Sequence, residues 1–211
     1  MKIHILGIGG TFMAGVAIIA KEMGHNVTGS DTNLYDPMKT VLINNKISFI
    51  ENYNSKTLDN NYDLIIVGNV MTRGMDIIEK LLDKKIPFTS GPEWLYDNVL
   101  SKKTVIAISG THGKTTTSSV VTHILKYAKK NPSYLIGGLP IGVKSPAKLT
   151  NSEYFVIEAD EYDTAFFDKR SKYLHYHPDV MVINNIEFDH ADIFENIEAI
   201  IKNFHHVLRT M

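Results

Sequence analysis

A loop that could bind the phosphates of a nucleotide lies near the middle of the chain, as Ser109-Gly110-Thr111-His112-Gly113-Lys114-Thr115-Thr116-Thr117. An apolar, strand-like run precedes this loop and a helical pattern follows it. Glycines let successive backbone N–H groups face phosphate oxygens, and the start of the helix adds partial positive charge. Lys114 can then reach the β- and γ-phosphates while a threonine hydroxyl binds Mg²⁺, although Ile108 replaces the first glycine of the strict motif.

Acidic residues follow a second apolar run, at residues 154–157. Ligands in open α/β sheets bind beyond the carboxyl ends of the strands, so we expect Glu158 to lie beside the phosphate loop. A carboxylate in that place suits Mg²⁺. Glu161 and Asp163 are more simply interpreted as a solvated acidic turn.

A third strand-like run leads into Asn184-Asn185-Ile186-Glu187-Phe188-Asp189-His190. Three successive strand ends therefore carry Lys114 with Thr115, then Glu158, then Asn185 with His190, and we expect these groups to converge. His112 could either contact the phosphates or be a bystander in the loop.

The amino-terminal part has its own glycine loop, in which Gly7, Gly9 and Gly10 follow an apolar run and Asp31 ends the next one. This spacing is similar to the dinucleotide fingerprint G-x-G-x-x-G with an acid about 20 residues further on. Phe12 occupies the third glycine position, where close approach of helix and strand is normally needed. NAD is therefore disfavoured, and another nucleotide diphosphate remains compatible.

The composition excludes several classes of function. Lys and Arg number 22 against 23 Asp and Glu, a net charge of −1, so no overall field attracts nucleic acid or an anionic membrane. The absence of cysteine excludes a thiolate metal site, a disulfide scaffold and a cysteine nucleophile. Apolar runs are about five residues long, against the ~20 of a membrane span, so we expect a cytoplasmic protein without membrane contact.

Strand and helix patterns alternate along the chain, which predicts an α/β fold with mostly parallel sheets. A polar stretch at residues 101–103 divides it into a first unit at 1–100 and a second at 101–211. The final helical pattern runs almost to Met211, leaving three or four strands for the second sheet, so we expect an incomplete second unit. Strands are predicted at 2–6, 27–30, 63–68, 87–89, 105–109, 134–136, 154–157 and 180–183, and helices at 11–23, 37–45, 73–84, 92–100, from the phosphate loop to about 128, and from about 197.

These motifs resemble those of the Mur ligases, which build the peptidoglycan peptide. Residues 110–116 resemble the family's ATP loop, and residues 185–190 resemble its second motif. Residues 158–172, with 7–15 and 89–95, resemble the members that recycle cell-wall peptide by joining L-alanyl-γ-D-glutamyl-meso-diaminopimelate to UDP-N-acetylmuramate. The resemblance implies a Rossmann-like UDP-sugar domain at 1–100, the first part of a P-loop ATPase central domain at 101–211, and a carboxyl-terminal domain absent from this chain.

The resemblance also implies roles for the candidate residues and an acyl phosphate mechanism. Gly110, Thr111, His112, Gly113, Lys114, Thr115, Thr116 and Asn185 would bind ATP. Thr115, Glu158 and His190 would lie on or near Mg²⁺, while Gly7, Gly9, Gly10 and Asp31 would bind the UDP-sugar. The catalytic residues would be Lys114, Glu158 and His190.

Three other functions stay open. One is a ligase that adds L-alanine to UDP-N-acetylmuramate, whose acidic motif normally lacks the pattern of residues 162–170. Another is a truncated binding module without ligase activity. The third is an NAD-dependent oxidoreductase, which is disfavoured because Phe12 occupies the third glycine position of the dinucleotide pattern.

Overall fold

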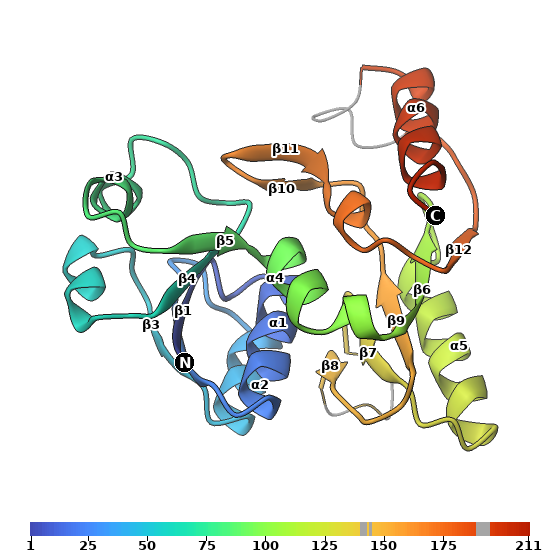
Figure 1. Ribbon diagram of the computed structural model, residues 1–211, viewed down its shortest axis with the longest axis horizontal. Helices are drawn as coiled ribbons and strands as arrows, with labels where there is room; N and C mark the ends of the chain where they lie inside the picture. Colours follow the sequence, from blue (N-terminus) through green and yellow to red (C-terminus); the bar gives the residue numbers. More distant parts are fainter. Residues whose placement is uncertain (140–142, 144, 189–194) are drawn as a thin grey trace.

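The computed structural model describes residues 1–139, 143, 145–188 and 195–211, and contains two parallel-sheet units that follow each other along the chain (Figure 1). The first sheet has the order β3-β2-β1-β4-β5, and all its neighbouring strands are parallel. The chain winds from β1 to one edge and then returns to the other side of β1, so the strand order reverses between β1 and β4. Ligands of such sheets bind at this reversal, next to the carboxyl ends of the strands. The strands are β1 (Lys2–Leu6), β2 (Asn26–Ser30), β3 (Ser48–Ile50), β4 (Leu64–Val67) and β5 (Phe88–Ser90).

Helices and short 3₁₀ turns follow the strands of the first unit, and the last helix and turn lead into the second unit. The start of α4 shows how local sequence sets a boundary: the Ser90 hydroxyl caps the helix by accepting from the Glu93 amide, and Pro92 lies in the first turn. The helices are α1 (Thr11–Glu22), α2 (Met38–Asn44), α3 (Asp76–Asp83) and α4 (Gly91–Asn98), and the 3₁₀ turns span Ser55–Asn60 and Leu100–Lys102.

The second sheet has five strands among the described residues, in the order β12-β6-β9-β7-β8. The expectation of three or four strands was therefore wrong. The extra strand, β8, is only two residues long and pairs antiparallel with β7, so it leaves no periodic pattern in the sequence. The strands are β6 (Thr104–Ser109), β7 (Ser133–Leu135), β8 (Ala147–Lys148), β9 (Tyr154–Glu158) and β12 (Val180–Ile183), and the helices are α5 (Lys114–Tyr127) and α6 (Ile197–Leu208).

A hairpin that the sequence patterns did not predict follows β9. Its strands, β10 (Asp163–Ala165) and β11 (Asp168–Ser171), pair antiparallel, and a 3₁₀ turn over Lys172–His175 comes directly after them. The hairpin extends toward the first unit (Figure 1). At its tip, the ring of Phe167 lies 5.2 Å from the ring of Phe88 on β5.

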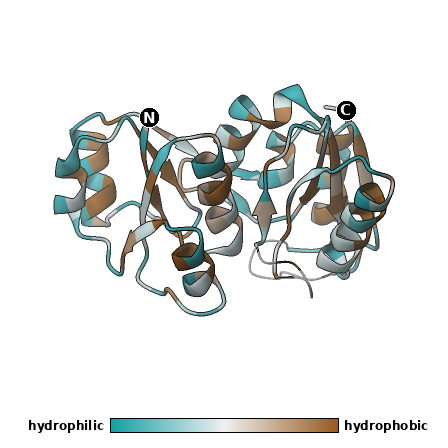
Figure 2. Cartoon of the chain, turned by 90° about the horizontal axis from the view of Figure 1, so that it is seen from below, coloured by the Kyte–Doolittle hydropathy of each residue, from teal (hydrophilic) through white to brown (hydrophobic). Residues whose placement is uncertain are grey.

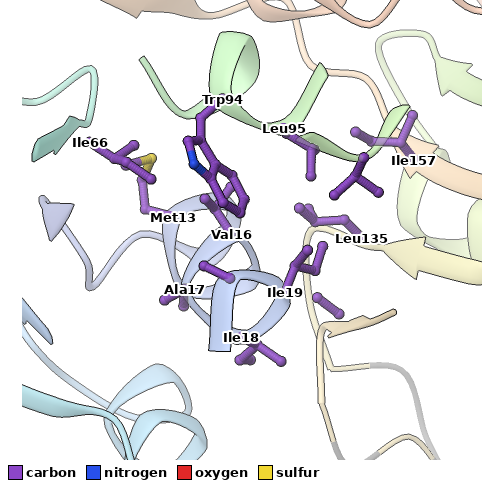
Figure 3. Close-up of a cluster of buried hydrophobic side chains, with 14 of the residues drawn as sticks. Met13, Val16, Ala17, Ile18, Ile19, Ile66, Trp94, Leu95, Leu135 and Ile157 are labelled. Carbon is purple, nitrogen blue, oxygen red and sulfur yellow. The ribbon is translucent and has the colours of Figure 1, made fainter. Parts of the chain in front are cut away.

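The two units share one hydrophobic core, and α1 lies in the middle of it. Every residue of α1 from Met13 to Ala20 is buried, because the helix packs on its own sheet and also on β7 and β8. Figure 3 shows Trp94 of α4, Leu135 of β7 and Ile157 of β9 around this helix. Gly15 permits the approach, since a Cβ there would lie 2.9 Å from Leu135 Cγ. In Figure 2, hydrophobic residues are concentrated in the strands and in the helices between the sheets.

Across the described residues, no helix combines the length and the apolar character required to cross a membrane.

Candidate functional site

The predicted phosphate loop connects β6 to α5 and turns at two glycines. Gly110 has φ +127° and Gly113 has φ +79°, both in the region that favours glycine. A Cβ at Gly110 would also lie 2.9 Å from the carbonyl oxygen of Asn185. The first amides of α5 have no intrahelical acceptor, and no side chain caps this helix, so its N-terminus is open to an anion.

Asn185 follows β12, the neighbour of β6, and forms hydrogen bonds with the backbone of the loop. Its side-chain oxygen accepts from the His112 amide at 2.9 Å, and its side-chain nitrogen donates to the His112 carbonyl at 3.1 Å. Its own carbonyl accepts from the Thr111 amide at 3.3 Å. Asn185 thus lies beside the loop, as expected, and its hydrogen bonds go to the loop backbone. Its role in binding ATP stays a prediction. The His112 ring is exposed, 3.9 Å from the Glu187 carboxylate, and Thr116 is exposed on the first turn of α5.

Lys114 lies back over its own loop. Its ammonium donates to the carbonyls of Gly110 at 2.6 Å and Thr111 at 3.3 Å, and lies 3.5 Å from Glu161 Oε2. Glu161 is only 4% exposed, and its other oxygen accepts from the Ser109 hydroxyl at 3.1 Å. The interpretation of Glu161 as part of a solvated turn was therefore wrong. Its position just past the end of β9, the neighbour of β6, is the signal that could have placed it beside the loop.

Glu158 and Thr115 meet as expected. The Thr115 hydroxyl donates to Glu158 Oε1 at 3.2 Å, and the amide of Gly137 donates to Glu158 Oε2 at 2.9 Å. Gly137 leaves the space for this carboxylate, because a Cβ there would lie 2.5 Å from Oε1.

These two side chains fit Mg²⁺, which takes oxygen ligands and usually completes its octahedron with substrate phosphates and water. Among the described residues, no group of three or more acidic, histidine or cysteine side chains is placed to hold a metal ion. His190, predicted as the third metal ligand, lies outside the described residues.

The amino-terminal glycine loop lies at the strand reversal of the first sheet. Gly7 has φ +81°, and Asp31 accepts from the amides of Gly9 at 2.7 Å and Asn33 at 2.9 Å. Asp31 thus uses both carboxylate oxygens to shape the loop. Gly10 precedes α1 without a side-chain cap, so the first amides of α1 are available to a phosphate. Phe12, which the dinucleotide pattern would not contain, stacks on Tyr176 of the second unit with ring centroids 6.3 Å apart.

A cavity of about 400 Å³, here called the central cleft, joins the two loops. Four of its lining residues follow β9 and had no role predicted from the sequence: Asp160, Tyr162, Thr164 and Lys172. A second hollow of about 830 Å³ continues from Gly9, Gly10 and Asp31 toward Tyr53. Burial, and then the nearby Asp31 carboxylate, raise the pKa of Tyr53. From the first half of the chain the central cleft is lined by Gly7, Gly10, Thr11, Phe12, Met13, Asp31, Asn69, Val70 and Pro92, and from the second half by Lys114, Leu135, Gly137, Glu158, Asp160, Tyr162, Thr164 and Lys172.

Within the hairpin beside this cleft, Asp168 is the most strongly paired acid. The Arg170 guanidinium donates to it at 2.9 and 2.7 Å and holds the pKa of that carboxyl at about 2. His175 lies 3.0 Å away, and its burial lowers the pKa of the imidazole. Asp168 and Arg170 therefore pair with each other on β11, and neither is among the residues that line the cleft.

Comparisons with known proteins match both halves of the chain. A model of the Mur ligase family catalytic domain matches residues 2–103, and a model of the Mur ligase middle domain matches residues 108–211. The chain is 53% identical to the UDP-N-acetylmuramate–L-alanyl-gamma-D-glutamyl-meso-2,6-diaminoheptandioate ligase of Escherichia coli, over 99% of this chain and 46% of the relative. It is 33% identical to a UDP-N-acetylmuramate–L-alanine ligase of Syntrophomonas wolfei, over 96% of this chain and 42% of that protein.

A solved structure agrees with these matches. The UDP-N-acetylmuramate:L-alanyl-gamma-D-glutamyl-meso-diaminopimelate ligase from Neisseria meningitides superimposes with a TM-score of 0.95 at 49% identity, covering 100% of this chain and 68% of that one. The chain spans about half the length of the curated relatives it matches.

Proposed function

The chain belongs to the Mur ligase family, and from this premise we propose that it carries the nucleotide-binding parts of an ATP-dependent ligase. That ligase joins L-alanyl-γ-D-glutamyl-meso-diaminopimelate to UDP-N-acetylmuramate and forms a C–N bond. The observation that carries this proposal is the central cleft, whose lining contains the glycine loop of the first unit and Lys114 with Glu158 of the second. Groups from both nucleotide loops thus border one cleft, in which the reacting ends of a sugar nucleotide and of ATP can meet.

On the ATP side, the amides of residues 110–116 and the Lys114 ammonium would bind the phosphates. For this, Lys114 must exchange its bonds to the Gly110 and Thr111 carbonyls for phosphate oxygens, a short rotation of a long side chain. Thr115 and Glu158 would hold Mg²⁺, with His190 proposed as a further ligand on the family resemblance. Bound Mg²⁺ would offset the charge that develops on the transferred phosphoryl group.

On the sugar side, Gly7, Gly9, Gly10 and the N-terminus of α1 would bind the diphosphate, with Asp31 fixing the loop. The lactyl carboxylate of the sugar would attack the γ-phosphorus of ATP, giving an acyl phosphate and ADP. The tripeptide amine would then attack the acyl carbon, lose a proton and expel phosphate. This chain's residues would act mainly by positioning the two anions and offsetting their charge.

The division into a sugar-nucleotide domain at 1–100 and an ATPase domain at 101–211 is proposed with this function. A cytoplasmic location is part of the same proposal, because both nucleotide substrates are used there.

A ligase specific for L-alanine is the second candidate, favoured by the 33% identity to such a protein. The higher identity to the tripeptide ligase opposes it. These 211 residues correspond to about half of the relatives' length, so by themselves we expect them to bind nucleotides without measurable turnover, as a binding module would.

A chimera tests the proposal. This chain is joined to the remaining part of the E. coli relative, and ADP release is followed with UDP-N-acetylmuramate, Mg²⁺ and ATP. We expect turnover with the tripeptide and none when L-alanine replaces it, and a Lys114→Ala chimera should be inactive. Turnover with L-alanine alone would favour the second candidate, and inactivity of a folded chimera with either amine would contradict both.

A further inference from the structure

A buried lysine in the central cleft has no role in the mechanism above. Lys172 is 7% exposed and lines the cleft together with Gly10, Lys114 and Glu158. Removing an ammonium from water is costly unless it is paired, and such costs are commonly retained where a charge has a function. Lys172 is therefore a candidate for substrate binding.

The ammonium of Lys172 lies where the two units meet. It is 3.0 Å from each carboxylate oxygen of Asp160, 5.5 Å from the ring centroid of Phe12 and 5.6 Å from that of Tyr162. Phe12 belongs to the first turn of α1, beside the glycine loop, whereas Asp160 and Tyr162 follow β9. In the part of the chain that the structure describes, the hydrogen bonds of this ammonium go to Asp160 alone. Because an ammonium has three donors, one remains for a ligand.

The β10–β11 hairpin fixes the position of Lys172. The Lys172 amide donates to the Tyr162 carbonyl at 3.1 Å, which closes the base of the hairpin. The Thr164 hydroxyl donates to the Arg170 carbonyl at 2.7 Å and ties its strands together. The hairpin tip packs on Phe88 of the first unit, so the lysine is held relative to both units. Such pre-organisation reduces the entropy lost when a ligand is bound.

We propose that Lys172 binds the lactyl carboxylate of UDP-N-acetylmuramate and holds it toward the γ-phosphate of ATP. This inference rests on the function proposed above and assigns one group within it. The reaction brings a carboxylate against a polyphosphate, and these anions repel each other. Lys114 lies in the phosphate loop and serves the ATP side, whereas Lys172 stands beside the glycine loop on the sugar side. Asp160 pairs the ammonium, and Lys172 would bridge Asp160 and the sugar carboxylate when the substrate binds.

Two sugar nucleotides that differ only in the lactyl group test this assignment. UDP-N-acetylglucosamine lacks the lactyl group and its carboxylate. The difference between its affinity and that of UDP-N-acetylmuramate, each measured by calorimetric titration, therefore gives the contribution of that group to binding. The parent chain should prefer UDP-N-acetylmuramate. Lys172→Met should lower the affinity for UDP-N-acetylmuramate by about tenfold to hundredfold, the range for a charge-assisted hydrogen bond. The affinity for UDP-N-acetylglucosamine should not change.

Lys103→Met is the matched control. Its ammonium is also partly buried, but it donates to the Thr150 and Ser152 carbonyls and does not line the cleft, so the preference should survive. If Lys172→Met does not fold, Lys172→Gln removes the charge while keeping a donor for Asp160, with the same result expected. The assignment would be overturned if the variant lost affinity equally for both sugar nucleotides, or if it still preferred UDP-N-acetylmuramate. It would also be overturned if the parent chain bound both with equal affinity. Binding of neither ligand by the parent would instead contradict the proposed function.

Discussion

Gly137→Ala should displace the Glu158 carboxylate and weaken the Mg²⁺-dependent part of nucleotide binding. The added Cβ would lie 2.5 Å from Glu158 Oε1 and 2.8 Å from its Cδ. Ordinary contact begins at 3.4 Å, so the carboxylate must retreat by about 0.9 Å. That movement breaks the 3.2 Å bond from Thr115 and strains the 2.9 Å bond from the Gly137 amide.

The expected loss follows from these contacts. A hydrogen bond to a charged group contributes about 1.5 to 3 kcal/mol, and the metal loses an aligned carboxylate as well. We therefore expect at least a tenfold loss of Mg²⁺-dependent affinity, or about 1.4 kcal/mol. Binding in the absence of Mg²⁺ should change little, because the phosphate loop itself is untouched.

The assay is titration of a fluorescent ATP analogue in Mg²⁺ and in EDTA, with thermal unfolding to confirm that each variant is folded. Gly138→Ala is the matched control, since its added Cβ would lie at an ordinary 3.5 Å from Thr115 Cγ2. Equal Mg²⁺ responses of the two folded variants would refute Glu158 as a metal ligand positioned by Gly137.

Three further predictions concern the loop, the shared core and a buried histidine. Lys114→Ala should weaken ATP binding by about 1.5 to 3 kcal/mol in the same titration, and unchanged affinity would mean that the loop is structural. Leu135→Ala should lower the free energy of unfolding by about 2 to 5 kcal/mol in urea, because the side chain is 1% exposed in the core shared by both units; a loss below about 1 kcal/mol would argue against that shared core. Burial lowers the pKa of His4 from 6.5 to about 4, with its ring nitrogens 2.8 Å from the Thr28 hydroxyl and 2.9 Å from that of Ser30. Between pH 6.5 and 4 the unfolded chain therefore binds a proton at His4 that the folded chain does not bind, and the free energy of unfolding should fall by up to about 3 kcal/mol over this range. The fall should be shallower in His4→Gln, and an equal fall would contradict the assignment to His4.

The sequence predicted the α/β fold and the meeting of Thr115 with Glu158 because both follow from local rules. Alternating strand and helix patterns require mostly parallel sheets, and the fold class is confirmed. Parallel strands place their carboxyl ends at one edge, so Thr115, in the helix after β6, and Glu158, at the end of β9, meet there. Their roles toward ATP and Mg²⁺ stay predictions.

The sequence could not predict the hairpin because its stability comes from distant contacts. β11 is Asp168-Lys169-Arg170-Ser171, which has neither β-branched residues nor an apolar alternation. Its partner strand is three residues long, and the hairpin tip is supported by Phe88, far away in the sequence. The burial of Lys172 depends on this hairpin and its base, so local sequence patterns could not predict it.

A crystal structure of this chain with UDP-N-acetylmuramate, Mg²⁺ and a non-hydrolysable ATP analogue tests most directly whether one cleft holds both substrates. We expect the γ-phosphate at Lys114 and Thr115, the sugar diphosphate at residues 7–10 and the start of α1, and the lactyl carboxylate between them facing the γ-phosphate. A sugar nucleotide bound outside the central cleft, or ATP bound at the amino-terminal glycine loop, would contradict the proposed function.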